Sequence, residues 1–263
     1  MNTEAARRFL PPALAEAVNG YHWQQILTGC STSQVFRLKK ADRERLYLKV
    51  DARSFTRPLK QEHLRLLWLR ERLPVPQTLM FAEAEDSDYL LLSEVAGVDA
   101  SDKSCQANAA QVIEQLAAGL KMIHSVPVDR CPFDMTLSRK VELAREMMLR
   151  GLVDESDFDE SRRGRTAQEL YDELIECVPA EEELVFTHGD YCLPNIILRD
   201  LLLSGFVDWG QAGIADRYQD IALAARSVES NYGREWVSAL FEACAITPDS
   251  AKLHFYTLLD EFF

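Results

Sequence analysis

The sequence reads His188-Gly189-Asp190-Tyr191-Cys192-Leu193-Pro194-Asn195 and, ten residues further on, Gly205-Phe206-Val207-Asp208-Trp209-Gly210. An aspartate, an asparagine five residues later and an Asp-x-Gly after a short apolar run are the residue types that metal-assisted phosphoryl transfer requires. Asp190 can orient an attacking hydroxyl and accept its proton. Asn195 and Asp208 supply the oxygen ligands that Mg²⁺ prefers. Each residue alone is ordinary, but their order and spacing together predict a site for phosphoryl transfer.

Such a site also requires a lysine on an early strand and a glutamate on the helix that follows. Lys49 ends the alternating run 46–49, and Glu62 lies 13 residues later in a predicted helix over 59–73. We expect Lys49 to hold the α- and β-phosphates of a nucleotide and Glu62 to hold Lys49 by an ion pair. No glycine-rich loop of the protein-kinase type precedes Lys49. In its place is a turn over 28–33, whose N–H groups and Ser31 hydroxyl would contact phosphate.

The chain changes character near residue 97. Before it lie short β-rich runs, at 35–38, 46–50, 78–81 and 89–92. After it lie mainly helical patterns, at 112–123, 137–149, 216–229, 235–244 and 248–259, with short strands near 196–198 and 205–207. The order of these elements predicts an α+β fold with two lobes. The first, over 1–96, is a small antiparallel sheet that binds nucleotide, and the second, over 97–263, is larger and mainly helical.

The charge composition of the chain indicates which classes of binding partner are favourable. The chain has 263 residues, of which 29 are Lys or Arg and 42 are Asp or Glu, so its net charge is −13. A protein this acidic repels phosphate backbones and anionic membrane surfaces, which makes nucleic acid and membranes unfavourable partners and favours cationic small molecules. No apolar run reaches the roughly 18 residues of a membrane span, and the first residues lack the pattern of a secretory signal. The six cysteines are scattered singly, as in reduced cytoplasmic proteins. We therefore expect a cytoplasmic protein.

Several segments together resemble the aminoglycoside 3′-phosphotransferase family. They are LYLK at 46–49, RLPVP at 72–76, LLLSEVAG at 90–97, HGDYCLPN at 188–195, GFVDWGQAGIADRYQDIALAARS at 205–227 and FYTLLDEFF at 255–263. The similarity runs from about residue 20 to residue 263. It implies a two-lobed, protein-kinase-like fold, found as a monomer or weak dimer. It also implies direct in-line transfer of the γ-phosphate of ATP, with Mg²⁺, to the 3′-hydroxyl of an aminoglycoside, which gives antibiotic resistance.

The resemblance assigns roles to matching positions. Asp190 becomes the catalytic base and Asn195 and Asp208 the magnesium ligands. The nucleotide is held at its phosphates by Lys49, Glu62 and Ser31, and at its adenine by Tyr47 (stacking), by the backbone of Ser93 and Val95, and by Ile197 and Val207 beneath the ring. The cationic drug meets a loop with Asp157, Asp159 and Glu160, a helix with Arg226 and Glu229, and a final segment with Asp260, Glu261 and the terminal carboxylate of Phe263.

The sequence also departs from the family pattern. Gln211 stands where relatives often carry arginine, which predicts a change in how the following loop is held. Ser227 and Ser230 are neutral where relatives can be acidic. His188 and Cys192 lie too close on one loop to face each other across a substrate, so we interpret His188 as a brace that holds the loop by hydrogen bonding.

Two other functions remain open. One is a kinase of the same fold that acts on another small amine or alcohol, such as choline, homoserine or a macrolide. The other is a non-catalytic protein that sequesters cationic drugs with a degenerate kinase site. The intact set of Lys49, Glu62, Asp190, Asn195 and Asp208 disfavours the second alternative.

Overall fold

The computed structural model describes residues 9–26, 33–54 and 56–263. The chain divides into two compact units. The first comprises Met1–Gly97 together with Ser204–Gly210, and the second comprises Val98–Leu203 together with Gln211–Phe263. The sequence pattern placed 204–210 with the second lobe, whereas in the structure this segment belongs to the first unit.

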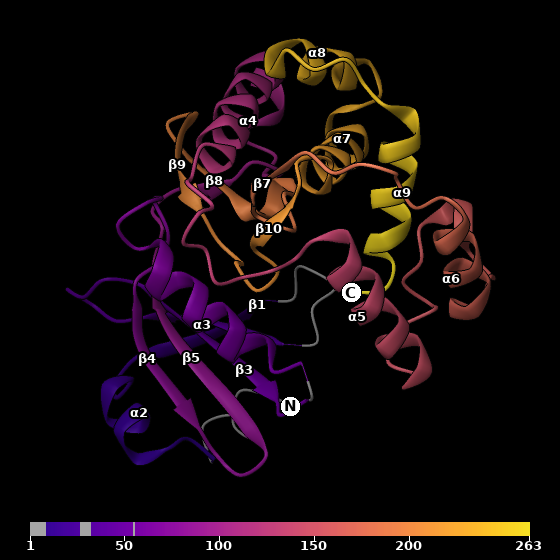
Figure 1. The fold of residues 1–263 in the computed structure, drawn as a ribbon. Coiled ribbons are helices and arrows are strands. Elements are labelled where there is room, and N and C mark those ends of the chain that lie inside the picture. The colour runs from indigo at the N-terminus through magenta and orange to yellow at the C-terminus, as the bar shows by residue number, and fades with distance from the viewer. Residues whose placement is uncertain (1–8, 27–32, 55) are drawn as a thin grey trace. The chain divides into compact units, whose positions relative to one another are not determined.

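The first unit is built on one antiparallel sheet (Figure 1). Its strands lie in the order β1-β2-β3-β5-β4, with bounds β1 His22–Ile26, β2 Gln34–Lys39, β3 Leu46–Ala52, β4 Thr78–Glu83 and β5 Ser87–Ser93. Alternate residues such as Phe36, Leu38 and Leu48 are fully buried, as the two-residue period of a strand requires. Helix α2, Pro12–Ala17, contributes Leu14 to the same core, and helix α3, Pro58–Leu69, packs against β3, β4 and β5.

Backbone contacts explain why the segment 204–210 joins the first unit. The Phe206 N–H donates to the Pro74 carbonyl over 3.0 Å, and the Ser204 hydroxyl donates to the Ala96 carbonyl over 2.7 Å. A Cβ atom at Gly205 would lie 2.5 Å from the Pro74 carbonyl oxygen, so only glycine allows this close approach. The segment is therefore tied to the first unit on both sides of Gly205.

The second unit is mainly helical. Its longer helices are α4 Ala109–His124, α5 Leu137–Leu149, α6 Ala167–Glu176, α7 Tyr218–Tyr232, α8 Glu235–Cys244 and α9 Ser250–Asp260, with short 3₁₀ turns at Gln106–Asn108, Glu160–Arg162 and Leu193–Asn195. Its short strands are β6 Val98–Asp99, β7 Leu184–Thr187, β8 Ile196–Arg199 and β10 Gly213–Asp216, and β9, Leu202–Phe206, leads from this unit into the segment that joins the first. Strand β7 pairs with β10, and the other sheet has the order β6-β8-β9.

Six named helices and strands were not predicted from the sequence: α2, β1, β6, α6, β7 and β10. Helix α6 has a detectable signal, because Thr166 accepts a hydrogen bond from the Glu169 N–H while the Glu169 side chain returns one to the Thr166 N–H. This capping box is readable as Thr-x-x-Glu. The strands β7 and β10 have only four residues each, too few to show a clear alternation.

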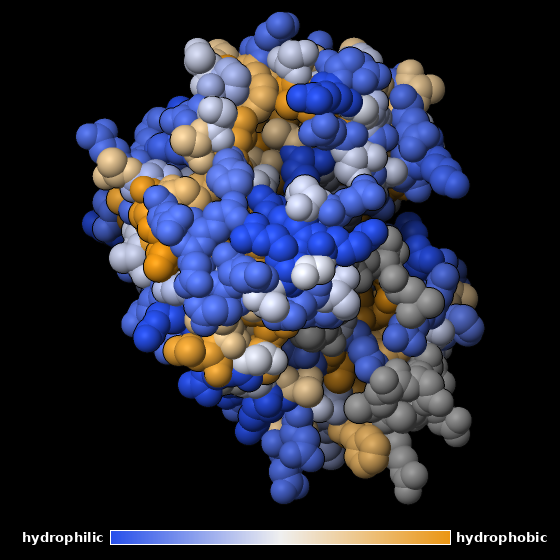
Figure 2. All heavy atoms as spheres, turned by 90° about the vertical axis from the view of Figure 1, so that its right-hand side faces the viewer, coloured by the Kyte–Doolittle hydropathy of each residue, from blue (hydrophilic) through white to orange (hydrophobic). Residues whose placement is uncertain are grey.

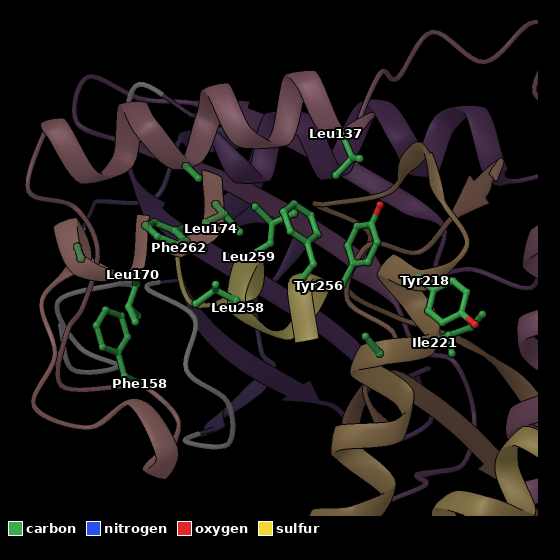
Figure 3. Close-up of a cluster of buried hydrophobic side chains, with 14 residues drawn as sticks. Leu137, Phe158, Leu170, Leu174, Tyr218, Ile221, Tyr256, Leu258, Leu259 and Phe262 are labelled. Atoms are coloured by element: carbon green, nitrogen blue, oxygen red, sulfur yellow. The ribbon is translucent and has the colours of Figure 1, made fainter. Parts of the chain in front are cut away.

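A cluster of buried apolar side chains from α5, α6, α7 and α9 forms a core of the second unit (Figure 3). Phe158 reaches this cluster from the loop between α5 and α6 and lies beside Leu170. Phe158 is buried, while Asp157 before it is exposed and Asp159 after it is half-buried. One buried phenyl ring thus anchors the acidic loop and leaves the flanking carboxylates outside the core.

Figure 2 shows hydrophilic side chains over most of the described residues on the face that it draws, with apolar residues in separate small groups. Within the described part of the chain, no helix combines the length and the apolar character that a membrane span needs.

Candidate active site

The first unit contains a buried ion cluster centred on Lys49 of β3. Its Nζ atom lies 2.8 Å from each carboxylate oxygen of Glu62 on α3 and 3.1 Å from Asp208 Oδ1. The helix and strand that the sequence linked by a 13-residue spacing therefore do bring these two side chains together. Asp208 joins them from the segment 204–210.

Burial and charge act in opposite directions on this lysine. Burial favours the neutral amine, but the carboxylates of Asp208 and Glu62 outweigh it, so the pKa of Lys49 lies above its ordinary value. Burial raises the pKa of Glu62, with a further contribution from Asp208, and the ammonium of Lys49 opposes both. The two carboxylates thus favour the charged form of Lys49 and hold its ammonium in place.

Asp208 has a backbone conformation that side chains rarely adopt. Its φ of 66° lies in the left-handed region, and its side chain is 45% exposed, far more than those of its two partners. The next residue, Trp209, is fully buried and its Nε1–H donates to the Phe206 carbonyl over 3.2 Å. The buried indole holds the strained turn in place, and the carboxylate of Asp208 keeps an exposed side toward solvent.

The structure describes the burial and backbone contacts of several residues expected around adenine. Tyr47 lies on β3, half-buried, two residues before Lys49. The Ser93 N–H already donates to the Gln77 carbonyl over 3.0 Å, so Ser93 can offer its carbonyl only. Ile197 of β8 and Val207 are half-buried. The two neighbours of Ile197 in sequence are fully buried. Ser31 lies outside the described residues.

The second unit contains the loop with Asp190 and Asn195. The Asn195 amide nitrogen donates to Asp190 Oδ2 over 2.8 Å and to the Asp190 carbonyl over 3.0 Å. Both acceptors are oxygens, so the amide must turn its nitrogen toward them, and these bonds do not use its own oxygen. The sequence-predicted pair is therefore brought together, with the carboxylate fixed and an amide oxygen of the kind that Mg²⁺ binds.

A buried aspartate that the sequence analysis did not single out organises this loop. Asp220, on α7 and fully buried, accepts from the His188 N–H over 2.9 Å and from the Gly189 N–H over 2.8 Å. His124 Nε2 of α4 also lies 3.1 Å from the Asp220 carboxylate. A signal for Asp220 was present, because it directly precedes the apolar run 221–225 of a helix, and an acidic residue buried beside such a run needs polar partners.

His188 acts as the expected brace. It is fully buried, and its Nδ1 accepts from the Asp190 N–H over 3.3 Å. Gly189 has a φ of 85°, and a Cβ there would lie 2.1 Å from the Gln211 carbonyl oxygen. The loop thus requires glycine at this position, and Asp190 is set by hydrogen bonds on both sides.

The two departures from the family pattern have structural counterparts. Gln211 Oε1 lies 3.5 Å from Nζ of Lys140, a buried lysine on α5 whose ammonium is 3.8 Å from the centre of the Phe263 ring. The Ser227 hydroxyl accepts from the Leu193 N–H over 3.0 Å. Ser227 therefore supports the loop that carries Asp190 and Asn195.

The structure brings four of the expected drug-binding residues into contact in the second unit: Asp159, Arg226, Asp260 and Glu261. Arg226 on α7 donates to Asp159 Oδ2 over 3.3 Å and also to Asp260. Glu261 is different, because its side chain is 4% exposed and accepts from Arg162 over 2.7 Å and from the Asp159 N–H over 3.1 Å. Burial raises the pKa of Glu261, as does Asp159, while Arg162 lowers it. Glu160 and Glu229 are exposed.

Comparison with known proteins shows the family to which the chain belongs. The model of the phosphotransferase enzyme family matches residues 22–256. An aminoglycoside 3′-phosphotransferase of Niallia circulans is 40% identical over 89% of this chain and 90% of its own, and one of Escherichia coli is 34% identical over 99% and 97%. The chain belongs to the aminoglycoside 3′-phosphotransferase family.

Solved structures of aminoglycoside phosphotransferases agree with this. The crystal structure of an aminoglycoside 3′-phosphotransferase of type VIII has a TM-score of 0.87 at 34% identity, over 95% of this chain and 97% of that one. The aminoglycoside phosphotransferase APH(3″)-Id of Streptomyces rimosus, in complex with ADP and streptomycin, has a TM-score of 0.84 at 28% identity, over 100% and 99%. The two-lobed, kinase-like fold expected from the sequence is therefore confirmed for this family member.

Proposed function

We propose that this chain transfers the γ-phosphate of ATP to the 3′-hydroxyl of aminoglycoside antibiotics in the cytoplasm, where ATP is present, and so gives resistance. The observation that carries the proposal is the paired loop in which the Asn195 amide holds the Asp190 carboxylate at 2.8 Å. This is the arrangement that a phosphotransferase needs to aim a hydroxyl while it offers a metal ligand beside the reacting atoms.

In this proposal, the first unit binds the nucleotide. The ammonium of Lys49, fixed by Glu62, holds the α- and β-phosphates, and the turn with Ser31 contributes N–H groups. Tyr47 stacks on the adenine, the backbone at Ser93 and Val95 meets its edge, and Ile197 and Val207 pack against the ring. The roles fit the observed positions, since Lys49 is a buried cation and Tyr47 lies on the same strand.

The chain's oxygen donors fit a magnesium ion. Asp208 supplies a half-exposed carboxylate and Asn195 an amide oxygen that its bonds to Asp190 leave unused. Magnesium binds proteins through one or two such groups and takes its remaining ligands from phosphates and water. Asp208 and Asn195 would hold the ion. When bound, the ion would neutralise charge on the phosphates.

The second unit supplies the base and binds the drug. Asp190 accepts a hydrogen bond from the 3′-hydroxyl, aims its oxygen at the γ-phosphorus and takes the proton as the new O–P bond forms and the bond to ADP breaks. The carboxylates of Asp157, Asp159, Glu160, Glu229 and Asp260 pair with the ammonium groups of the drug. Glu261, already bonded to Arg162, holds the loop that carries Asp159. The terminal carboxylate of Phe263 is a further proposed contact for the drug.

The testing experiment measures ADP release with ATP and Mg²⁺ in the presence of kanamycin or ribostamycin. Matched reactions contain 3′-deoxy tobramycin or choline. We expect turnover with the first pair and a sharp fall with 3′-deoxy tobramycin. Turnover with choline alone would indicate a kinase for another small alcohol, and binding of drugs without any turnover would indicate a sequestering protein.

The variant Asp190→Ala tests the assignment of the base. Its rate should fall by roughly 10²–10⁴, the usual contribution of general base catalysis, while ATP binding is retained. Asn195→Ala is a matched control, since it removes the neighbouring polar group and should raise the Mg²⁺ concentration needed for turnover. Full turnover in Asp190→Ala would exclude Asp190 as the base.

A further inference from the structure

Two of the carboxylates proposed to bind the drug, Asp159 and Asp260, already have cationic partners within the chain. Asp159 accepts from Arg226 and from Arg162, each over 3.3 Å, and Asp260 accepts from Arg226. The pKa of Arg226 is affected first by burial, which lowers it, but Asp260 and Asp159 outweigh burial and raise it. At Asp159 and Asp260, a polycationic ligand therefore does not meet bare carboxylates. It has to compete with a guanidinium that is already bound.

The two arginines differ in how firmly they are held. The Arg162 side chain is 9% exposed, and besides the carboxylates of Asp159 and Glu261 it donates to the carbonyl and hydroxyl oxygens of Thr257. The Arg226 side chain is 30% exposed, and its partners Asp159 and Asp260 are 40% and 22% exposed. Arg162 is part of the packed structure, whereas Arg226 and its partners are accessible to water and to a ligand.

We propose that Arg226 is an exchangeable internal cation that occupies the drug-ammonium positions on Asp159 and Asp260 until the substrate displaces it. This inference rests on the proposed function. It makes Arg226 a specificity-determining residue, because one guanidinium holds two carboxylates at once. A ligand with a single cationic group replaces only one of the two contacts, while a ligand with several ammonium groups replaces both.

The structure offers a place for the displaced side chain. Glu229 lies three residues after Arg226 on α7, and residues three apart are neighbours on a helix surface. Glu229 Oε1 lies 4.0 Å from Arg234 Nε, and the Arg234 side chain is 91% exposed, so this pair is weak. Arg226 and Glu229 also line the same hollow of about 310 Å³, together with Asp159 and Thr257. Arg226 can therefore turn from Asp159 and Asp260 toward Glu229.

The first test measures binding rather than turnover. Kanamycin and 3′-deoxy tobramycin are titrated into wild type, Arg226→Met and Arg226→Gln by calorimetry, at about 50 mM and about 500 mM NaCl. We expect both variants to bind both drugs about tenfold more tightly than wild type at low salt, with a smaller difference at high salt. The control, Arg162→Met, should bind more weakly, because it leaves the buried Glu261 without its cation.

The second test is a double-mutant cycle with Glu229→Gln. If Glu229 receives the displaced Arg226, Glu229→Gln weakens drug binding in wild type but has little effect in the Arg226→Met background. If Glu229 contacts the drug only directly, the loss is equal in both backgrounds. An equal loss would overturn the proposed route for Arg226.

The remaining outcomes separate this inference from the proposed function. Weaker binding by both Arg226 variants, or failure of both to fold, would show that Arg226 is a fixed structural contact and would overturn the inference alone. Failure of wild type to bind either drug would overturn the proposed function as well. Because 3′-deoxy tobramycin lacks the acceptor hydroxyl, its binding tests the exchange of cations independently of phosphoryl transfer.

Discussion

The chain contains two clusters with similar chemistry and different burial, one in each unit. Lys49 lies between the carboxylates of Glu62 and Asp208, and Arg226 lies between those of Asp159 and Asp260. The Lys49 and Glu62 side chains are nearly inaccessible, while Arg226 and Asp159 remain open to water. Burial makes the first cluster permanent, because a charge separated there would be unsolvated. Water makes the second cluster exchangeable, because each separated charge is solvated again.

The largest effect is expected from Lys49→Met. It leaves the Glu62 carboxylate buried without its cation, so the free energy of unfolding should fall by about 3–5 kcal/mol, the usual result of breaking a buried ion pair. Urea denaturation measures this. Phosphoryl transfer should be lost at the same time.

The double variant Lys49→Met with Glu62→Gln is the control for that prediction. Neutralising Glu62 removes the unpaired charge, so we expect part of the stability to return but none of the activity. Equal stability of Lys49→Met and wild type would mean that the cluster around Lys49 contributes no more to stability than accessible ion pairs do.

The same chemical change in the exposed cluster should have a much smaller effect on stability. Asp260→Asn removes one carboxylate charge next to Arg226, as Glu62→Gln does next to Lys49. We expect Asp260→Asn to change the free energy of unfolding by about 1 kcal/mol or less, the range for accessible ion pairs. A loss in urea denaturation as large as that of Lys49→Met would contradict the distinction between the clusters.

Salt should separate the clusters without mutation. Raising NaCl from about 50 mM to about 500 mM shortens the screening length severalfold, which weakens accessible charge pairs and leaves buried ones nearly unchanged. The KM for kanamycin should therefore rise about tenfold, while the midpoint of urea denaturation moves little. A KM that is independent of salt would argue against binding through exposed carboxylates.

The smallest effect concerns His63, the residue after Glu62 on α3. Its ring stacks on Phe81 with 4.9 Å between centres, and burial lowers the pKa of His63. The folded chain then binds this proton more weakly than the unfolded chain, whose histidine pKa is about 6.5. The contribution to stability is complete above that pH and declines as the pH falls below it.

The variant His63→Phe keeps a stacked ring without a titrating group. Between pH 7.5 and pH 5.5 its melting temperature should fall slightly less than that of wild type. Identical pH profiles for the two proteins would show that His63 has no part in the pH dependence.

Local patterns predicted those parts of the molecule in which neighbours in sequence share one task. The spacing from Lys49 to Glu62 and the loop from Asp190 to Asn195 are of this kind, and both pairs are in contact in the structure. Strand and helix patterns likewise located β3, β5, α5 and α8 to within a residue or two.

Contacts between distant segments were beyond the local patterns. Nothing near Gly205 in sequence shows that its missing side chain makes room for the Pro74 carbonyl, which ties 204–210 to the first unit. In the same way, an acidic run suggests a solvated loop and does not reveal that Arg226 and Arg162 already neutralise Asp159. Arg226 lies 67 residues from Asp159 in sequence, so tertiary packing creates that contact, whereas Arg162 lies only 3 residues away in the same segment.

Asp220 also bears on how this protein can evolve. It holds two backbone N–H groups of the loop with Asp190 from within the core, so nearly any change there disturbs the loop itself. The carboxylates at Asp157, Glu160 and Glu229 lie outside that support and are exposed. In the proposed function, selection can therefore alter ligand contacts one surface residue at a time without disturbing the loop that Asp220 holds.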